Sequence, residues 1–362
     1  MQHKIAYYIT PHGFGHAVRS FVVIDELRKI HPDLEVVIVS DLPDILIQQN
    51  LGETISQRRR RLDIGLVQLD SLRFDLAASK EKLLDLHRYQ ATLVAEEVSF
   101  FREQQITAVV CDIPFLPLVA ATRAGLPTIG IGNFTWDWIY QALASSDSTW
   151  QPIVSWIRQS YRHCGLFLQL PMHGDCSICP QVRDVPLVAR RARHTPEEVR
   201  TILGMGEGQK MVLISFSDLE LDQSAQQRLE KMREVLFLYK KPLHFSFANS
   251  CCVENPSLSY ADLVAAVDGV VTKPGYGIVA DCLSHGTPMI YTDRGPFPEC
   301  EILVRTMTEH LPVVFLPSGD LYSGNWETAV GQLPDKPGLR PQIQVDGGRV
   351  CAEIILAHLG WR

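Results

Sequence analysis

The sequence predicts an α/β protein made of two doubly wound domains, and three observations support this prediction. The chain has 362 residues, more than one ordinary hydrophobic core accommodates. Short β-branched apolar runs alternate with helical patterns along most of it, which is typical of parallel strands joined by crossover helices. The alternation breaks once, after Pro171, and then starts again. We therefore expect two similar halves that face each other across a cleft.

The first half, over residues 1–170, is expected to form a Rossmann-like domain. Its strands and helices are predicted from "KIAYYIT", "AVRSFVVIDELRKI", "LEVVIVSD", "TAVVCD", "FLPLVAATRAG" and "PTIGIG", in this order. Residues 171–195 are rich in Pro and Arg and show no hydrophobic period, so they are expected to form the interdomain linker.

The second half, over residues 196–345, is expected to form another Rossmann-like domain. Its elements are predicted from "MVLISF", "LHFSFA", "YADLVAAV", "GVVTKP", "PMIYTD" and "PVVFLP". The last helical pattern, "GGRVCAEIILAHL" within residues 346–362, predicts a terminal helix that packs back on the first domain. Ligands of open α/β sheets bind beyond the carboxyl ends of the strands, so the candidate site residues are sought there.

The composition narrows the classes of function. A net charge of −7 argues against a nucleic-acid partner held by charge. The one basic run, Arg58 to Arg61, is either a solvated loop or a patch for an anionic ligand. No apolar stretch approaches the ~20 residues of a membrane span, although peripheral membrane contact stays open. Without a signal-peptide pattern we expect a cytoplasmic protein whose nine cysteines are reduced.

The first turn of the chain has the pattern of a ligand-binding loop. Gly13 and Gly15 stand between a strand and a helix, where bare backbone allows a ligand to approach a helix N-terminus. A dinucleotide-binding fingerprint has a third glycine at the position of Val18, which this sequence lacks. The acid that such a fingerprint has at the end of the second strand is present as Asp41, so a dehydrogenase remains an alternative. His16 can move a proton near neutral pH, or it is a capping or packed residue.

Asp112 is the candidate partner of that histidine. It ends the strand "TAVVCD", and the carboxyl ends of parallel strands share one edge of a sheet. A carboxylate there would hold the imidazole in one tautomer and stabilise its protonated form. The alternative is that Asp112 caps the helix that follows.

The second half contains a candidate phosphate site. A strand ends in Thr272 and Lys273 and is followed by a glycine-rich helix start, where backbone amides and a lysine attract phosphate. The residue order of a P-loop is absent. After the next strand, Arg294 and Glu299 lie in a loop at the same edge, where a carboxylate can accept hydrogen bonds from a ribose diol. The residues of the glycine-rich helix start are Gly275, Tyr276 and Gly277.

The stretch "HGDCSIC" has some features of a metal site. Cys176 and Cys179 have the spacing of a zinc ligand pair, with His173 nearby. A structural zinc site needs a second pair, and only His163 and Cys164 are near in sequence. An ordinary loop is the preferred interpretation, and we expect no metal.

Several stretches, taken in their order along the chain, resemble the GT-B nucleotide-sugar glycosyltransferases. These include the plant UDP-glycosyltransferases and the bacterial lipid-linked N-acetylglucosaminyltransferase. The nearer likeness is to the glycosyltransferase-like amino-terminal domain of plant arabinokinases. The stretches are "GFGHAVRS", "DIGLVQLDSL", "NFTWDW", "PLVAR", "KPGYG" and "RGPFPE".

The resemblance implies roles for the candidate residues. His16, after Gly15, would deprotonate the acceptor hydroxyl, and Asp112 would orient it. A nucleotide-diphosphate sugar, with a UDP-sugar favoured, would be the co-substrate, and no cofactor is expected. Acceptor contacts would come from "NFTWDW", although packed aromatics are an equal alternative. The residues implied for the nucleotide sugar are Gly13, Gly15, Ser217, Lys273, Gly275, Tyr276, Gly277, Arg294 and Glu299, and those for the acceptor are Trp136, Asp137 and Trp138.

The sequence also departs from that family in two places. Lys273 stands in the region where a diphosphate-binding histidine is usual, and "FSDL", with Ser217 and Asp218, replaces a usual "FGG". The expected function is a metal-independent, inverting glycosyltransferase that acts on an acceptor hydroxyl. The alternatives are a non-catalytic nucleotide-sugar-binding module and a nucleotide-sugar epimerase on the same fold.

Overall fold

The structure is a computed structural model that describes residues 3–52, 54–70, 72–205, 208–295, 297–334 and 343–361. The chain divides into two compact units. The first comprises Met1–Val67, Asp75–Ala189 and Gln344–Arg362, and the second comprises Gln68–Phe74 and Arg190–Ile343. The change between the units therefore falls at Ala189 and Arg190, inside the stretch predicted as a linker.

In its described residues, the first unit holds a seven-stranded parallel sheet in the order β3-β2-β1-β6-β7-β8-β9. The central strands β1, β6 and β7 are almost wholly buried, as strands covered on both faces must be. The strands are β1 (Lys4–Ile9), β2 (Glu35–Val39), β3 (Ser56–Arg58), β6 (Ala108–Asp112), β7 (Thr128–Gly132), β8 (Leu166–Gln169) and β9 (Val182–Asp184).

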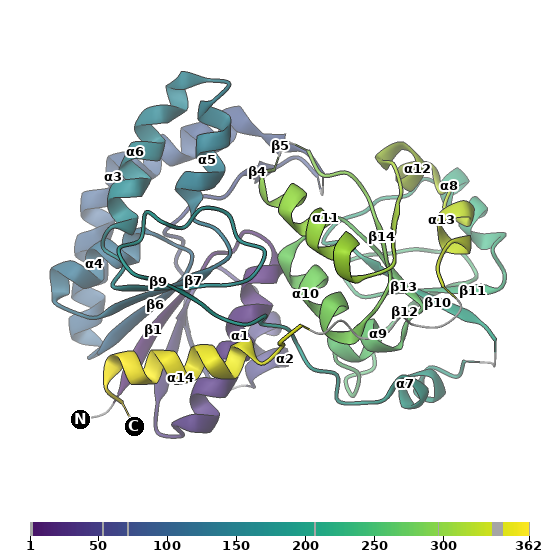
Figure 1. The fold of residues 1–362 in the computed structure, drawn as a ribbon, viewed down its shortest axis with the longest axis horizontal. Coiled ribbons are helices and arrows are strands. Elements are labelled where there is room, and N and C mark those ends of the chain that lie inside the picture. The colour runs from purple at the N-terminus through teal and green to yellow at the C-terminus, as the bar shows by residue number, and fades with distance from the viewer. Residues whose placement is uncertain are drawn as a thin grey trace. The chain divides into compact units, whose positions relative to one another are not determined.

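Helices cover both faces of this sheet (Figure 1). α1, α2 and α14 pack together on one face, and α3, α4 and α6 pack together on the other. The helices are α1 (Phe14–Ile30), α2 (Asp44–Leu51), α3 (Leu76–Glu103), α4 (Leu116–Ala124), α5 (Trp136–Ala144), the 3₁₀ turn η1 (Ser148–Trp150), α6 (Gln151–Tyr161) and α14 (Gly347–Leu359).

The terminal helix α14 belongs to the first unit, although the second unit precedes it in sequence. It lies along α1, and Gly348 meets the side chain of Val22 so closely that a Cβ at this position would come within 2.6 Å of Val22 Cγ1. Beyond α14, the Trp361 ring stacks on His3, with ring centroids 4.2 Å apart. The two ends of the first unit are thus held together.

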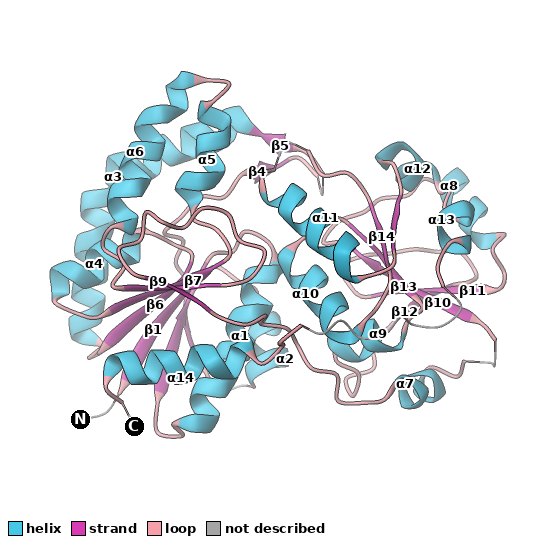
Figure 2. Cartoon of the chain, viewed as in Figure 1, coloured by secondary structure: helices cyan, strands magenta, loops and turns pink. Residues whose placement is uncertain are grey.

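The second unit is built on a six-stranded parallel sheet in the order β12-β11-β10-β13-β14-β15, within its described residues (Figure 2). Its strands are β10 (Lys210–Ser215), β11 (Val235–Tyr239), β12 (Ser250–Cys252), β13 (Gly269–Thr272), β14 (Met289–Tyr291) and β15 (Val313–Phe315). Its helices are α7 (Pro196–Ile202), α8 (Gln223–Glu230), α9 (Tyr260–Ala266), α10 (Tyr276–His285), α11 (Glu299–His310), α12 (Ser318–Ser323) and α13 (Glu327–Gly331).

A short segment from the first half of the sequence belongs to the second unit. The chain forms a small hairpin from β4 (Val67–Gln68) and β5 (Phe74–Asp75), and residues 68–74 cluster with the second unit. Leu72 is part of that unit's buried hydrophobic cluster, and the Phe74 ring lies 5.7 Å from that of Phe297. The apolar pattern of the sequence had not singled out this segment.

The basic run at Arg58 to Arg61 is neutralised by acidic side chains. Arg58 pairs with Glu97 at 2.5 Å, Arg59 with Asp44 at 2.6 Å and Arg61 with Asp41 at 3.0 Å, while Arg60 pairs with Glu96. The run is therefore not a free patch for an anionic ligand. Among the described residues, no helix is both long and apolar enough to cross a membrane.

Candidate functional site

The first candidate site lies where the strand order of the first sheet reverses. β1 has β2 on one side and β6 on the other, and Ile9 at the end of β1 is in register with Asp112 at the end of β6. Such a switch point leaves a crevice beyond the carboxyl ends of two strands, because their following segments run in opposite directions. The loop after β1 therefore enters the sheet edge beside Asp112.

Gly13 fixes the geometry of this loop. It has φ 82° and ψ 155°, a conformation that residues with a side chain rarely adopt, and it is the residue before α1. A Cβ at Gly13 would meet no atom within 4 Å, so the glycine is required by backbone conformation and leaves open space above the helix start. Gly15 follows in the first turn of α1, and His16 comes next.

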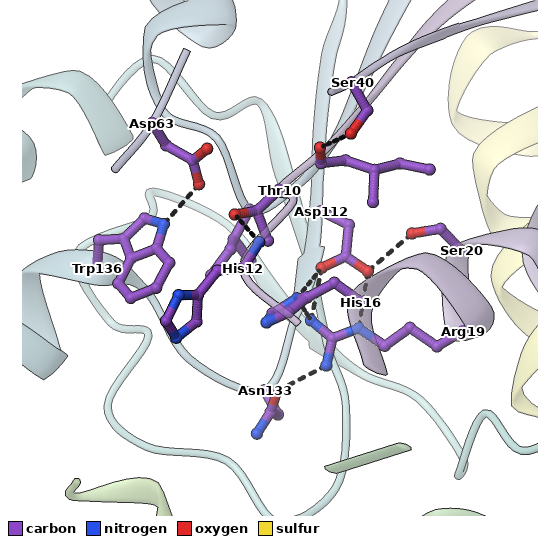
Figure 3. A network of polar contacts seen from close by, with 12 residues as sticks. Thr10, His12, His16, Arg19, Ser20, Ser40, Asp63, Asp112, Asn133 and Trp136 are labelled. Atoms are coloured by element: carbon purple, nitrogen blue, oxygen red, sulfur yellow. Dashed lines mark hydrogen bonds and ion pairs between the residues drawn. The ribbon is translucent and has the colours of Figure 1, made fainter. Parts of the chain in front are cut away.

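His16 and Asp112 are in direct contact (Figure 3). His16 Nδ1 lies 2.8 Å from Asp112 Oδ1, and the His16 side chain is 10% exposed whereas that of Asp112 is fully buried. Asp112 does not cap α4, whose preceding residue is Phe115 and which has no side-chain cap. The alternative that Asp112 caps the next helix is therefore wrong.

Arg19 and Ser20 complete the hydrogen bonds of Asp112. Arg19 donates from Nε to Oδ2 at 2.7 Å and from Nη2 to Oδ1 at 2.5 Å, and Ser20 Oγ donates to Oδ2 at 2.9 Å. Arg19 Nη1 also donates to Asn133 Oδ1 at 2.7 Å, which ties the helix to the end of β7. Figure 3 shows the guanidinium of Arg19 joined to the carboxylate of Asp112 by these hydrogen bonds.

The donors around Asp112 leave one acceptor position open for His16. A carboxylate has about four acceptor positions, and Arg19 and Ser20 fill three of them. In one tautomer Nδ1 accepts a hydrogen bond from Arg19 Nη2, which lies 2.8 Å away. In the other, Nδ1 carries the proton and donates it to the fourth position, on Asp112 Oδ1. In this tautomer Nε2 carries the lone pair and can accept a proton from a ligand.

Asp112 is ionised over the physiological range. Burial alone would raise its pKa, but the charge and hydrogen bonds of Arg19, followed by those of His16, lower the pKa of Asp112 to about 2. It therefore acts as an acceptor only.

A second buried acid, Asp63, lies at the same site. Its Oδ2 accepts a hydrogen bond from Trp136 Nε1 at 2.8 Å, and burial raises the pKa of Asp63. The sequence reasoning named neither Asp63 nor Arg19. Arg19 could have been found from its spacing, because residues three apart share a helix face with His16. Asp63 lies in the loop between β3 and β4, and although it opens the stretch "DIGLVQLDSL", its distance from any strand end gave no reason to place it at this site.

The acceptor residues predicted from "NFTWDW" need correction. Trp136 is fully buried and stacks on Tyr140, with centroids 5.6 Å apart, so it offers no face to an acceptor. Asp137 is also buried, and its carboxylate accepts a hydrogen bond from Arg158. Only Trp138 of the three is partly exposed, and it packs on Gly174. The packed-aromatic alternative holds for Trp136.

The second candidate site lies at the corresponding switch point of the second unit. β10 and β13 are neighbours, and Ser215 is in register with Thr272 at their carboxyl ends. Lys273 follows β13 directly. Burial, then the charge of Arg294, lower the pKa of Lys273 to about 8, while Asp70 and Asp218 act in the opposite direction. Two cations thus lie close together at one sheet edge.

Arg294 is anchored beside the start of α10. Its Nη1 donates to Pro274 O at 3.0 Å and lies 3.4 Å from Glu299 Oε2, and its side chain is 8% exposed. Its buried Nε has no hydrogen-bond partner among the described residues. Glu299, the first residue of α11, is buried and shares its carboxylate with this arginine. Pro296 of the same loop lies outside the described residues.

The remaining predicted residues of this site take different positions. Gly275 precedes α10, and a Cβ there would meet nothing within 4 Å, so the approach to the first amides of the helix is open. Tyr276 and Gly277 are buried in the first turn of α10. Ser217, two residues after β10, is exposed.

The stretch weighed as a zinc site forms a loop with buried thiols. Cys176 and Cys179 are buried, and His173 Nδ1 lies 2.8 Å from the carbonyl oxygen of Gly174. Burial and neighbouring acids raise the pKa of the Cys176 thiol, which disfavours the thiolate that binds zinc. In the part of the chain that the structure describes, no group of three or more His, Cys, Asp or Glu residues is arranged to hold a metal ion.

The sequence of the chain is similar to that of one known plant protein. No family model matches the chain. L-arabinokinase of Arabidopsis thaliana is 29% identical over 358 residues, which are 97% of this chain. The chain spans about a third of the length of that relative (34%).

Solved glycosyltransferase structures share the fold at low sequence identity. CalG4, the calicheamicin glycosyltransferase, matches with a TM-score of 0.65 at 13% identity over 99% of both chains. Medicago truncatula UGT71G1, solved in complex with UDP-glucose, matches with a TM-score of 0.63 at 12% identity over 99% of this chain and 98% of that one. The fold and the likeness to a plant arabinokinase that the sequence predicted are confirmed: this chain is a GT-B-fold protein.

Proposed function

We propose that this protein is an inverting glycosyltransferase that moves a sugar from a nucleotide diphosphate to an acceptor hydroxyl. The supporting observation is the 2.8 Å contact between His16 and the fully buried Asp112 at the first switch point. With Nδ1–H donated to Asp112, His16 Nε2 takes the hydroxyl proton while the acceptor oxygen attacks the anomeric carbon. Attack from the face opposite the leaving group inverts that carbon.

The second unit supplies the groups for the leaving diphosphate. Lys273 and Arg294 are cations at the start of α10, where backbone N–H groups and the helix dipole also favour negative charge. The Arg294 Nε without a partner among the described residues is a free donor for a phosphate oxygen. These fixed charges can do the work of a divalent cation, so we propose that transfer is metal-independent. Glu299 remains the candidate for the ribose hydroxyls.

The comparisons suggest which donors to try first. One structural relative was solved with UDP-glucose and another, VinC, with dTDP. UDP- and dTDP-sugars therefore head the panel, with GDP-sugars beside them. Because one relative is named L-arabinokinase, ATP with L-arabinose forms a separate arm. We favour UDP-sugars, and we propose no resident cofactor.

The test is a binding screen followed by turnover. Calorimetry against the donor panel identifies the nucleotide, and donor hydrolysis or transfer to small acceptors is then measured with and without EDTA. His16→Gln should lower turnover by ~10²–10⁴-fold and leave donor binding intact, since His16 is not among the residues proposed to bind the donor. His358→Gln, an exposed histidine on α14, is the matched control.

Each other outcome points to a different function. Wild-type turnover in His16→Gln removes the base assignment. Donor binding without hydrolysis or transfer indicates a nucleotide-sugar-binding module. A donor sugar converted without any acceptor indicates an epimerase, and phosphate transfer from ATP indicates a kinase. Loss of activity in EDTA would overturn metal independence.

A further inference from the structure

We propose that Arg19 is a positioning residue that cancels the charge of Asp112, so that this carboxylate orients His16 without holding it protonated. The inference rests on the proposed role of His16 as the base. A buried carboxylate that is left alone beside an imidazole stabilises the protonated ring. A histidine that is already protonated cannot take the proton of an acceptor hydroxyl.

The contacts of Arg19 fit this role closely. Its side chain is 1% exposed, and Nε and Nη2 bind the two oxygens of Asp112 at 2.7 and 2.5 Å. The third nitrogen binds Asn133 Oδ1 at 2.7 Å, which fixes the plane of the guanidinium from a second strand end. A lysine cannot make this planar three-point contact. Arg19 is thus rigidly placed one helical turn after His16.

The charges around His16 then balance in a specific way. Asp112 and Arg19 form a pair without net charge, while the hydrogen bond from Nδ1 to Asp112 still sets the tautomer. Asp112 therefore orients the His16 ring, while Arg19 cancels the negative charge that Asp112 would otherwise place beside the ring.

Other polar groups face the same cluster from every neighbouring element. Asp63 comes from the loop before β4, and its own pKa responds to the charge of His16. The Phe134 ring stands edge-on to His16 at 5.6 Å. The other groups that touch Asp112 or Arg19, or whose pKa responds to their charge, include Ser20 on α1, Asn133 after β7, Tyr7 on β1, Cys111 on β6, Cys176 between β8 and β9, and Cys351 on α14. Of these neighbours only Asp63 adds another carboxylate, so it is kept unchanged in all variants.

The experiment follows the His16 ring by NMR as a function of pH, in protein labelled at histidine and with His16→Gln for assignment. Arg19→Gln removes the charge and keeps an N–H donor for Asp112. We expect the titration midpoint of His16 to move upward by about 1–3 pH units, the range expected when a neighbouring charge is removed. Arg19→Lys, which keeps the charge, should titrate as the wild type does. Arg88→Met, an exposed arginine on α3, is the control.

A double variant guards against misfolding. Arg19→Gln with Asp112→Asn removes both charges and leaves no buried ion alone. Cancellation predicts that this variant titrates close to wild type, whereas a downward shift would mean that Asp112 had controlled the ring despite Arg19. That result, or an unchanged midpoint in Arg19→Gln, overturns the proposal. An upward shift in Arg19→Lys equal to that in Arg19→Gln would also overturn it.

A turnover measurement separates this inference from the proposed function. If His16 is the base, the acid limb of the pH–rate profile should move upward in Arg19→Gln together with the NMR midpoint. If the midpoint moves but no transfer or hydrolysis is found in wild type, the function fails and the role of Arg19 stands. If transfer is found and the midpoint stays, the function stands and the role of Arg19 fails.

Discussion

Acid should weaken the first unit through one residue, Asp112, by an amount that the structure sets. Asp112 is fully buried and bound by Arg19, Ser20 and His16, and its pKa in the folded protein is about 2. An exposed aspartate in an unfolded chain has a pKa of about 3.9. Because the folded value is the lower one, the ionised carboxylate stabilises the fold above about pH 4. That stabilisation is lost as the pH falls toward 2.

The size of the effect follows from the two pKa values. A difference of about two pKa units corresponds to about 2–3 kcal/mol of unfolding free energy. The group is completely buried, so solvent screening takes little away from this figure. Other acids of the chain titrate over the same range, and a reference protein must remove their share.

The reference is the double variant Arg19→Gln with Asp112→Asn, which lacks the pair. The most destabilising change to a buried ion pair is to leave one charge without its partner, and the double variant avoids this, so it is expected to fold. Hydrogen exchange of the β1 and β6 amides reports on opening of the first unit alone, which avoids treating two units as one transition. Asp25→Asn, whose partner Lys29 is exposed with it on α1, is the surface control.

The expected result is a larger loss of stability in acid for the wild type than for the double variant. Between pH 5 and pH 2 the opening free energy of wild type should fall by about 2 kcal/mol more than that of the double variant. Asp25→Asn should follow the wild type. If wild type and the double variant lose stability in parallel, Asp112 is not held in its ionised form by Arg19, and the assignment of this network is wrong.

Three further predictions concern the second site and the terminal helix. The pKa of Lys273 is about 8, so its charge is lost above that pH, and calorimetry should show UDP affinity falling from pH 7 to pH 9. In Lys273→Arg the UDP affinity should not fall over this pH range. An equal fall in affinity in this variant and in the wild type would place the phosphate contact elsewhere. Glu299→Ala should bind ribo- and 2′-deoxyribonucleotides alike if this carboxylate holds the ribose, whereas a retained preference would point to another acid. A Cβ at Gly347 would come within 2.1 Å of Pro186 O, so Gly347→Ala should destabilise the first unit by about 1–3 kcal/mol in thermal unfolding. Gly331→Ala, where a Cβ meets open space, should show no such loss.

The contact between His16 and Asp112 could be predicted because it depends only on strand order. Both residues follow apolar strands, and parallel strands place their carboxyl ends at one edge. The pattern does not reveal which other side chains fill the edge. Arg19 is buried although arginine is usually exposed, and its contacts with Asp112 and Asn133, which no sequence pattern reveals, explain its position.

Two features stayed hidden because they lack a hydrophobic signal. β9 is exposed along its whole length, so nothing in its sequence separates it from a linker. The segment 68–74 joins the second unit through Leu72 and Phe74, and no hydrophobic period in this short stretch assigns the two residues to a distant sheet. Trp136 could not be assigned from sequence, because a tryptophan can either stack on a ligand or pack in a core. Its complete burial in the structure places it in the core.

The position of α14 in the sequence has a consequence for synthesis on the ribosome. The second unit, apart from residues 68–74, is one continuous stretch and can close on itself as soon as residue 343 has emerged. The first unit is made first but needs α14, which follows the second unit, to cover α1. Domains generally fold as they are synthesised, from the N-terminal side. Here the helix face of α1 that α14 covers stays exposed in the earlier-made unit while more than a hundred residues are added.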